Sequence, residues 1–188
     1  LLIYDMMLDE CAKTIFERRT KAVEQLLPLV ERYYALLSSD RERIGMQYRS
    51  DLQEGTMADM LLASRRKDFI NEHTTVGVHR DDVIFTIAEY PLRKFGSQGQ
   101  QKSFLVALKL AEYTLLAEHN NEKPILLLDD LFDKLDMGRV AQLLRLVGSE
   151  MFGQIFITDC NKHRLQRTLS EAGAEYKLFT IAEGKHHE

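Results

Sequence analysis

Residues 95–136 read FGSQGQQKSFLVALKLAEYTLLAEHNNEKPILLLDDLFDKLD. A turn containing Gly and Ser opens this stretch, and a segment with apolar residues at helical spacing follows it. We expect that helix to run to about Glu118. Its expected core stripe is Leu105, Leu108, Ala111 and Leu115. After Pro124, the apolar run Ile125–Leu128 ends in two aspartates, as expected for a strand buried on both faces. A turn, a helix and a buried strand with acids at its end form a recurring arrangement for nucleotide phosphates.

The two aspartates, Asp129 and Asp130, follow the apolar run directly. Ligands of parallel α/β sheets bind at the carboxyl ends of the strands, so we expect both side chains in that crevice. The first carboxylate can hold Mg²⁺, directly or through water, because this ion takes oxygen ligands and bridges phosphates. The second can orient and polarise the attacking water in phosphoryl transfer. Apolar runs that end in aspartate are common in α/β proteins, so this pattern needs support from elsewhere in the chain.

The turn Ser97-Gln98-Gly99-Gln100 adds a second constraint. Glycine lets the backbone approach a ligand closely, and a helix N-terminus presents unpaired N–H groups to phosphate oxygens. Ser97 could donate a hydrogen bond to the same oxygens, or it could simply cap its helix. Both interpretations stay open at this point.

Helix and strand patterns alternate after this stretch. We expect helices at about 137–147 and 162–172, a buried strand at 154–158 and a last strand at 176–181. Ahead of it, residues 73–90 are expected to form a turn and a strand. The chain is therefore predicted to have an α/β fold, with a mostly parallel sheet and flanking helices.

The first part of the chain is predicted to be mainly helical. Apolar or long-stemmed residues recur at steps of four and three from Leu8 to Leu36, the heptad rhythm of a helix packed along a seam. Pro28 is expected to kink or divide this helix, because proline removes a backbone donor. Alternation over residues 44–48 predicts a short strand, and Thr56 is expected to cap a second helix. In that helix the expected inward-facing residues are Met57, Met60, Leu61 and Phe69.

Composition narrows the class of protein. At 188 residues, with 45% apolar and 29% charged residues, the chain fits one globular domain, or one domain with an appendage. Its net charge of −4 offers no global basic field, so any nucleic-acid contact needs a local patch such as Arg65-Arg66-Lys67. Cys11 and Cys160 lie far apart, as expected for two reduced thiols in a cytoplasmic protein. The longest apolar run is too short to cross a bilayer, so we expect no membrane partner.

Four motifs occur in the order found in ABC-type ATPases: the Ser97 turn as signature, ILLLDD as Walker B, Lys134-Leu135-Asp136 as D-loop, and QIFITD (154–159) at the switch position. Within that superfamily the chain resembles the RecF family of bacterial recombinational-repair ATPases. The resemblance rests on TTVGVHRDD (74–82), FGSQGQQKSFLVALKLAE (95–112) and ILLLDDLFDKLD (125–136). It covers nearly the whole chain and about half of a full family member. The long first helix resembles the helical arm of the family's second lobe, which implies an arm at 1–72 and an ATPase portion at 73–188.

The resemblance implies a role for each acid. Asp129 would be the carboxylate associated with Mg²⁺, and Asp130 would activate the attacking water. Asp136 would belong to the D-loop at a dimer interface. Thr158 and Asp159 take the switch position, where many ABC ATPases carry histidine, so γ-phosphate sensing by this pair is an open question. Asp159 could instead only cap the next helix.

The resemblance also implies that the signature turn acts on a second subunit. Ser97, Gly99 and Gln100 would contact the γ-phosphate of ATP held by the opposite subunit of a head-to-tail dimer. Gln98 stands where the common motif has glycine, which narrows backbone access there. No GxxxxGK[ST] P-loop occurs in the 188 residues. We therefore expect a C-terminal part of a longer ATPase that is inactive on its own.

The implied function is that of an ATP-dependent DNA-binding protein of replication, recombinational repair and the SOS response. The full-length protein would be a weak DNA-dependent ATPase that forms a homodimer on ATP. It would bind single-stranded and gapped duplex DNA and support recombinase loading with RecR and RecO. The alternatives are an SMC-like chromosome-structural ATPase, disfavoured by the short arm, and a transporter subunit, disfavoured by the paired aspartates.

Overall fold

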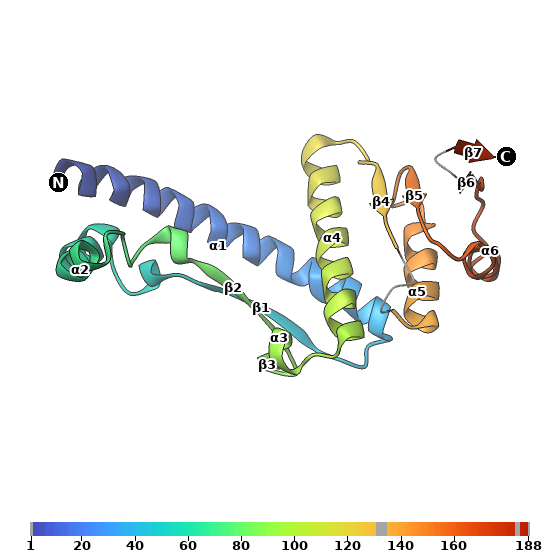
Figure 1. Cartoon of the computed structure of the whole chain (residues 1–188), viewed down its shortest axis with the longest axis horizontal. Helices are drawn as coiled ribbons and strands as arrows, with labels where there is room; N and C mark the ends of the chain where they lie inside the picture. The colour runs from blue at the N-terminus through green and yellow to red at the C-terminus, as the bar shows by residue number, and fades with distance from the viewer. Residues whose placement is uncertain (1, 131–134, 183–184, 188) are drawn as a thin grey trace.

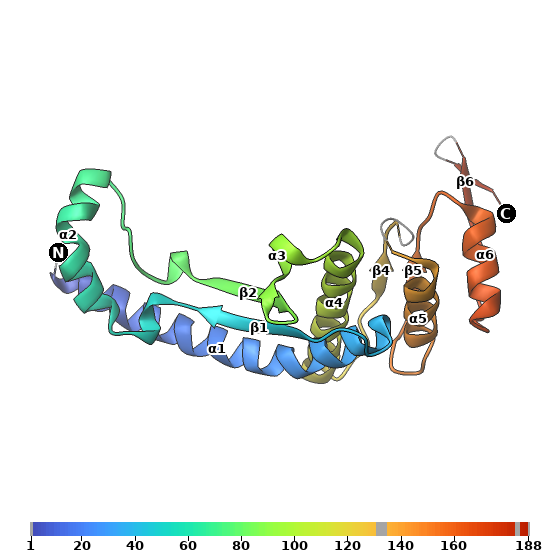
Figure 2. The same cartoon turned by 90° about the horizontal axis from the view of Figure 1, so that it is seen from below.

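The computed structural model describes residues 2–130, 135–182 and 185–187. The molecule is elongated: a helical arm occupies one end of its long axis and an α/β part occupies the other (Figures 1 and 2). Helix α1 (Leu2–Ser38) runs the length of the arm and reaches the α/β part with its C-terminal end. There it packs against α4 (Gln98–Asn120), so this helix contact joins the two parts.

Helix α1 is continuous through Pro28. Of the two outcomes expected for this proline, a kink or a division of the helix, the division is therefore wrong. A proline inside a helix costs about 3 kcal/mol or more. The turns that follow Pro28 bury Val30 and Leu37 completely or nearly so, which contributes roughly 3–6 kcal/mol and favours continuing the helix. Although α1 has 37 residues, neither it nor any other helix in the described ranges is long and apolar enough to cross a membrane.

An antiparallel sheet lies along α1 (Figures 1 and 2). Its strands are β1 (Ile44–Arg49), β2 (Asp82–Ile87) and β3 (Tyr90–Pro91), and two short 3₁₀ turns, η1 (Asp51–Gln53) and η2 (Val78–Arg80), lie between β1 and β2. Met46 of β1 pairs with Phe85 of β2, which confirms the strand expected from the alternation over 44–48. The β1–β2 pairing joins segments from both sides of residue 72, and the division of the chain there stays a prediction.

Helix α2 (Met57–Asn71) forms the tip of the arm. Its cap is the expected one, because Thr56 Oγ1 accepts a 3.2 Å hydrogen bond from the backbone N–H of Asp59. The small core between α2 and α1 consists of Ala12, Met57 and Leu61. Phe69 was expected to face inward and is 88% exposed. That expectation is wrong, since the buried residues of α2 all lie in its first turns.

The α/β part contains the predicted parallel strands. Its elements are α3 (Leu92–Phe95), α4, β4 (Leu126–Leu128), α5 (Met137–Val147), β5 (Ile155–Ile157), α6 (Lys162–Glu171), β6 (Thr180–Ala182) and β7 (Lys185–His187). β4 and β5 pair in parallel. β6 was expected to extend the same sheet, but it pairs antiparallel with β7. The α/β class is thus confirmed, with a parallel sheet that has two strands in the described ranges.

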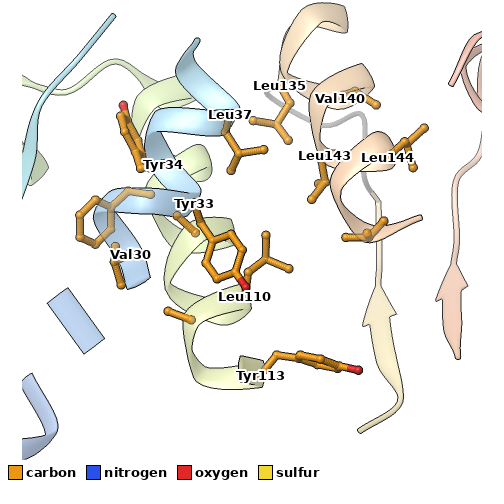
Figure 3. Close-up of a cluster of buried hydrophobic side chains, with 14 of the residues drawn as sticks. Val30, Tyr33, Tyr34, Leu37, Leu110, Tyr113, Leu135, Val140, Leu143 and Leu144 are labelled. Carbon is orange, nitrogen blue, oxygen red and sulfur yellow. The ribbon is translucent and has the colours of Figure 1, made fainter. Parts of the chain in front are cut away.

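The main core lies where α1, α4 and α5 meet, and Figure 3 shows side chains of these helices converging. Its fully buried members include Val30 and Tyr33 of α1, Leu110 of α4 and Leu143 of α5. The Tyr33 hydroxyl shares a 2.7 Å hydrogen bond with Thr114 of α4, so its polar atom is satisfied inside the core. The core therefore fixes α4 and α5 relative to the C-terminal end of α1.

Candidate functional site

The carboxyl edge of the parallel sheet brings three of the predicted site residues together. Asp129 and Asp130 follow β4, and Thr158 follows β5. The Thr158 backbone N–H donates to the carbonyl of Leu128 at 2.9 Å, which continues the strand pairing up to the site. The Thr158 hydroxyl donates to Asp129 Oδ1, and the Asp130 backbone N–H donates to Thr158 Oγ1 at 3.4 Å. Thr158 therefore orients the Asp129 carboxylate.

Asp130 has a backbone conformation that side chains rarely adopt. Its φ is +48°, in the left-handed region. Aspartate is one of the few side chains that adopt this region readily, so the turn after β4 suits this residue type. Asp129 and Asp130 are both exposed. Among the described residues, no group of three or more acidic, histidine or cysteine side chains could hold a metal ion by itself. Mg²⁺ is usually held by one or two carboxylates together with substrate phosphates, and the carboxylates at this edge fit that smaller requirement.

The signature turn is a capping box at the start of α4. Gln100 N–H donates to Ser97 Oγ at 3.2 Å, and Ser97 N–H donates to Gln100 Oε1 at 2.7 Å. The cap therefore uses the hydroxyl of Ser97 as an acceptor and leaves its proton for another partner. Gln98 and Gly99 form the first turn of α4, and Gly99 O accepts from the Ser103 hydroxyl at 2.8 Å. The role of this turn as a cap is confirmed, and its contact with a γ-phosphate stays a prediction.

Asp136, the last residue of the predicted D-loop, caps α5. Its Oδ1 accepts from the Arg139 backbone N–H at 2.9 Å, and its Oδ2 lies 3.1 Å from Arg139 Nε. Lys134, which opens the predicted D-loop, lies outside the described residues. The remaining side chain of the D-loop, Leu135, is buried in the main core.

Glu42 and Arg139 were not anticipated from the sequence. Arg139 Nη2 donates to Glu42 Oε1 at 3.1 Å, and Gln100 Nε2 donates to the same oxygen at 3.0 Å. Arg139 Nη1 donates to the Ser103 hydroxyl at 2.7 Å, and the Tyr34 hydroxyl donates to Glu42 Oε2. The sequence points to Arg139 only through its spacing from Asp136, because a cation three residues after a capping aspartate can pair with it. Glu42, in the polar stretch after α1, has no such signal.

The ionisation of this cluster follows from its surroundings. Burial acts to raise the pKa of Glu42, but hydrogen bonds from Tyr34 and Gln100 and the charge of Arg139 outweigh it, so the pKa lies below its ordinary value. Burial, followed by the hydrogen bond to Glu42, raises the pKa of Tyr34. For Arg139, burial favours the neutral form, yet Tyr34 and the negative charge of Glu42 raise its pKa above the ordinary value. Glu42 and Arg139 are thus an ion pair at neutral pH.

Asp159 does not cap α6, contrary to one of the two roles considered for it. The cap is Asn161, whose Oδ1 accepts from the Arg164 backbone N–H at 3.0 Å. Asp159 Oδ1 instead accepts from the Asn161 N–H at 2.6 Å, and the buried Asp159 carboxylate lies 3.8 Å from Arg164 Nη2. Of the two residues at the switch position, Thr158 is the one that contacts Asp129, the first aspartate of the predicted Walker B motif.

The predicted site residues therefore fall into two groups. Asp129, Asp130 and Thr158 form the first, at the sheet edge. Ser97 and Gln100 form the second group, at the start of α4. In the described part of the chain, their side chains hydrogen-bond to this same turn and to Glu42, and none of these bonds reaches the first group. An apolar groove of about 490 Å³ between α4 and β4 extends to Asp129 and is lined partly by Leu105.

The parallel strands β4 and β5 carry acids at their carboxyl edge. A serine-capped helix precedes them and an aspartate-capped helix follows β4. This is the arrangement of the C-terminal part of an ABC-type ATPase. No protein-family model matches the chain. It is 38% identical over 97% of its length to the DNA replication and repair protein RecF of Bacteroides thetaiotaomicron, and it covers 50% of that protein. The RecF of Flavobacterium johnsoniae is 41% identical over 96% of the chain, again with 50% of that protein covered.

Solved structures agree. The recombination mediator protein RecF-ATPrS in the RecFOR pathway superposes with a TM-score of 0.74 at 26% identity, over 98% of this chain and 49% of that one. RecF-ATP in the same pathway gives 0.71 at 29% identity, over 86% and 45%. The chain belongs to the RecF family and corresponds to the C-terminal half of its members. It spans about half the length of the curated relatives it matches.

Proposed function

We propose that this chain supplies the C-terminal half of an ATP-dependent DNA-binding protein of replication and recombinational repair. The observation that carries the proposal is the hydrogen-bonded group of Asp129, Asp130 and Thr158 at the carboxyl edge of β4 and β5. Parallel α/β sheets bind their ligands at this edge. The family names and the structures of RecF with nucleotide support ATP as that ligand.

At the sheet edge, each residue has a separate role. Asp129, oriented by the Thr158 hydroxyl, would hold Mg²⁺ directly or through water. When bound, the ion neutralises charge on the phosphate oxygens and aligns them for transfer. Asp130 would accept a proton from the attacking water or orient it.

The signature turn would serve a nucleotide held by a second subunit. Ser97 can donate its hydroxyl proton to a γ-phosphate oxygen while its oxygen still caps α4. The backbone N–H groups of Gln98 and Gly99, in the first turn, would face the same anion, because the N-terminus of a helix attracts negative charge. ATP would then join two copies head to tail, with Asp136 of each D-loop at the interface, and hydrolysis would separate them.

DNA is the proposed partner of this dimer, with single-stranded and gapped duplex DNA as substrates. By family membership, RecR and RecO are the proposed protein partners in recombinase loading, and the cytoplasm is the proposed compartment. Arg66 and Lys67 on α2 are exposed, whereas Arg65 is engaged with Asp5 at 2.9 Å. The arm tip therefore offers two cations for a phosphate backbone, and their contribution to DNA affinity is testable by salt dependence.

The decisive experiment replaces Asp130 by Asn in the full-length protein. Nucleotide binding and ATP-induced dimerisation are expected to persist, while hydrolysis falls by about 10²–10⁴-fold, because a general base contributes about that much. Glu122→Gln is the matched control, an exposed acid in the loop on the amino side of β4. Turnover unchanged in Asp130→Asn would remove this residue from its role.

Dimerisation has its own test in the variant Ser97→Arg. The long side chain would fill the space for the partner's γ-phosphate, so ATP should no longer produce a dimer in sedimentation or light scattering. A Ser97→Arg protein that dimerises as well as the parent would contradict the contact across the interface.

A further inference from the structure

The signature turn and the D-loop are connected through the interior of one subunit. On one side, Gln100 uses its side-chain oxygen to hold Ser97 N–H and its side-chain nitrogen to reach Glu42. On the other side, Arg139 holds Asp136 through both its backbone N–H and its Nε. The two sides meet at one atom, Glu42 Oε1, which accepts from Gln100 and Arg139 alike. No direct bond between Gln100 and Asp136 is needed for them to be coupled.

The connecting residues come from distant parts of the chain and are shielded from water. Glu42 lies 97 positions before Arg139. Their side chains are 21% and 16% exposed. Tyr34 and Ser103, from α1 and α4, complete the hydrogen bonding of the pair. Charged groups held in this way keep a narrow geometry, because each departure leaves a charge without its partner.

We propose that Glu42 and Arg139 are positioning residues that hold the signature turn and the D-loop in one fixed relative geometry, so that both engage the partner subunit as a unit. This inference rests on the proposed function, because it concerns the ATP-dependent interface. Ser97 would meet the partner's nucleotide only in the orientation that Gln100 and Glu42 impose. Asp136 would reach the same interface in the orientation that Arg139 imposes. Movement at either contact is then transmitted to the other.

A purely structural role for the pair makes a different prediction. If Glu42 and Arg139 only stabilise the fold, replacing both by apolar residues of similar size would leave the interface intact. Such paired replacements are often neutral for stability or stabilising. Under the positioning role, the same replacement keeps the protein folded but disconnects the signature turn from the D-loop.

A double-mutant cycle in the full-length protein separates these roles. Gln100→Ala removes the link to Glu42 together with the bond that Gln100 Oε1 accepts from Ser97 N–H. Asp136→Asn keeps a good helix cap while removing the charge facing Arg139. The ATP-induced dimerisation constant is measured for both single variants and for their combination. We expect the combined effect to differ from the product of the single effects by at least about fivefold, as for residues in one network. Gln100→Ala combined with Glu171→Gln, on the exposed side of α6, is the control and should be multiplicative.

The cycle is then repeated with Glu42→Met and Arg139→Met together. The coupling factor is expected to fall to about one while the nucleotide affinity of the monomer stays near the parent value. The melting temperature is expected to fall somewhat, because the buried Tyr34 hydroxyl loses its acceptor. If this variant unfolds, Glu42→Gln takes its place, and the coupling factor is expected to fall below that of the parent. A factor near one in the parent, or a factor unchanged in the replaced background, overturns the inference. A parent protein that fails to dimerise on ATP overturns the proposed function and this inference with it.

Discussion

Ser97 can be made to lose its two roles one at a time. Aspartate is as good a helix cap as serine, so Ser97→Asp keeps an acceptor for the Gln100 N–H that now bonds to Ser97 Oγ at 3.2 Å. The same carboxylate would stand where the partner's γ-phosphate is proposed to lie. Ser97→Ala has the opposite effect, because it removes the cap and adds no charge.

The two substitutions have different magnitudes. Two like charges about 4 Å apart repel by roughly 4 kcal/mol at an effective dielectric constant of about 20, so Ser97→Asp should weaken the ATP-dependent dimer about 10³-fold. Its effect on stability should be within about 0.5 kcal/mol, since the cap is kept. Ser97→Ala should destabilise the protein by about 1 kcal/mol. It should weaken the dimer by the loss of one hydrogen bond to a charged group, about tenfold.

The assays are thermal unfolding and sedimentation of the full-length protein with and without ATP. Asn161→Ala is the control for cap loss, because it removes the cap of α6 and should lower stability as Ser97→Ala does without changing dimerisation. If Ser97→Asp forms the ATP dimer as tightly as the parent, no anion lies next to this hydroxyl and the proposed contact is refuted.

Three further perturbations test the core, the ion pair and the long helix. Leu110→Ala should lower the free energy of unfolding by about 2–5 kcal/mol, because Leu110 is fully buried where α1 and α4 meet; a loss below 1 kcal/mol in denaturant titration would contradict this packing. The folded-state pKa of Glu42 lies below its ordinary value of 4.5, so the stability that its charge contributes is present above about pH 4.5 and is lost as pH falls through the folded pKa. The melting temperature of the parent should therefore exceed that of Glu42→Gln at pH 7, and the gap should narrow below pH 4.5; a constant gap would contradict it. Pro28→Ala should stabilise the protein by up to about 3 kcal/mol, because it restores a donor at an exposed position in α1; a lower melting temperature would refute this.

Features with local causes could be predicted from the sequence. The caps at Thr56 and Ser97 each depend on a bond to a residue three positions later, and such bonds are determined by the residues involved. The strand after Pro124 and the two acids that follow it were located in the same way, because a short apolar run after a proline is typical of a strand. The strand is Leu126–Leu128. The expectation that it is buried on both faces is wrong, because Leu127 is 71% exposed.

The orientation of helices that are apolar on several sides could not be predicted in this way. In α4, the expected stripe contained Leu105, which is 52% exposed, whereas its neighbour Phe104 is 3% exposed. Both faces have leucine, valine or phenylalanine at helical spacing, so spacing alone does not select the face that meets α1. Similarly, the heptad seam of α1 was expected to include Leu36, which is 46% exposed.

The ion pair of Glu42 and Arg139 was missed for a different reason. In sequence, Glu42 lies in a polar, charged stretch that is typical of a solvated connection after a helix, and charges in such stretches are usually exposed. The environment that makes Glu42 important exists only after α1, α4 and α5 have packed, because Tyr34, Gln100 and Arg139 come one from each of these helices. Residues that would touch nucleotide could thus be found by motif, since the ligand constrains their type and spacing. Residues that would hold two motifs in register are constrained only by the packed fold, so geometry is needed to find them.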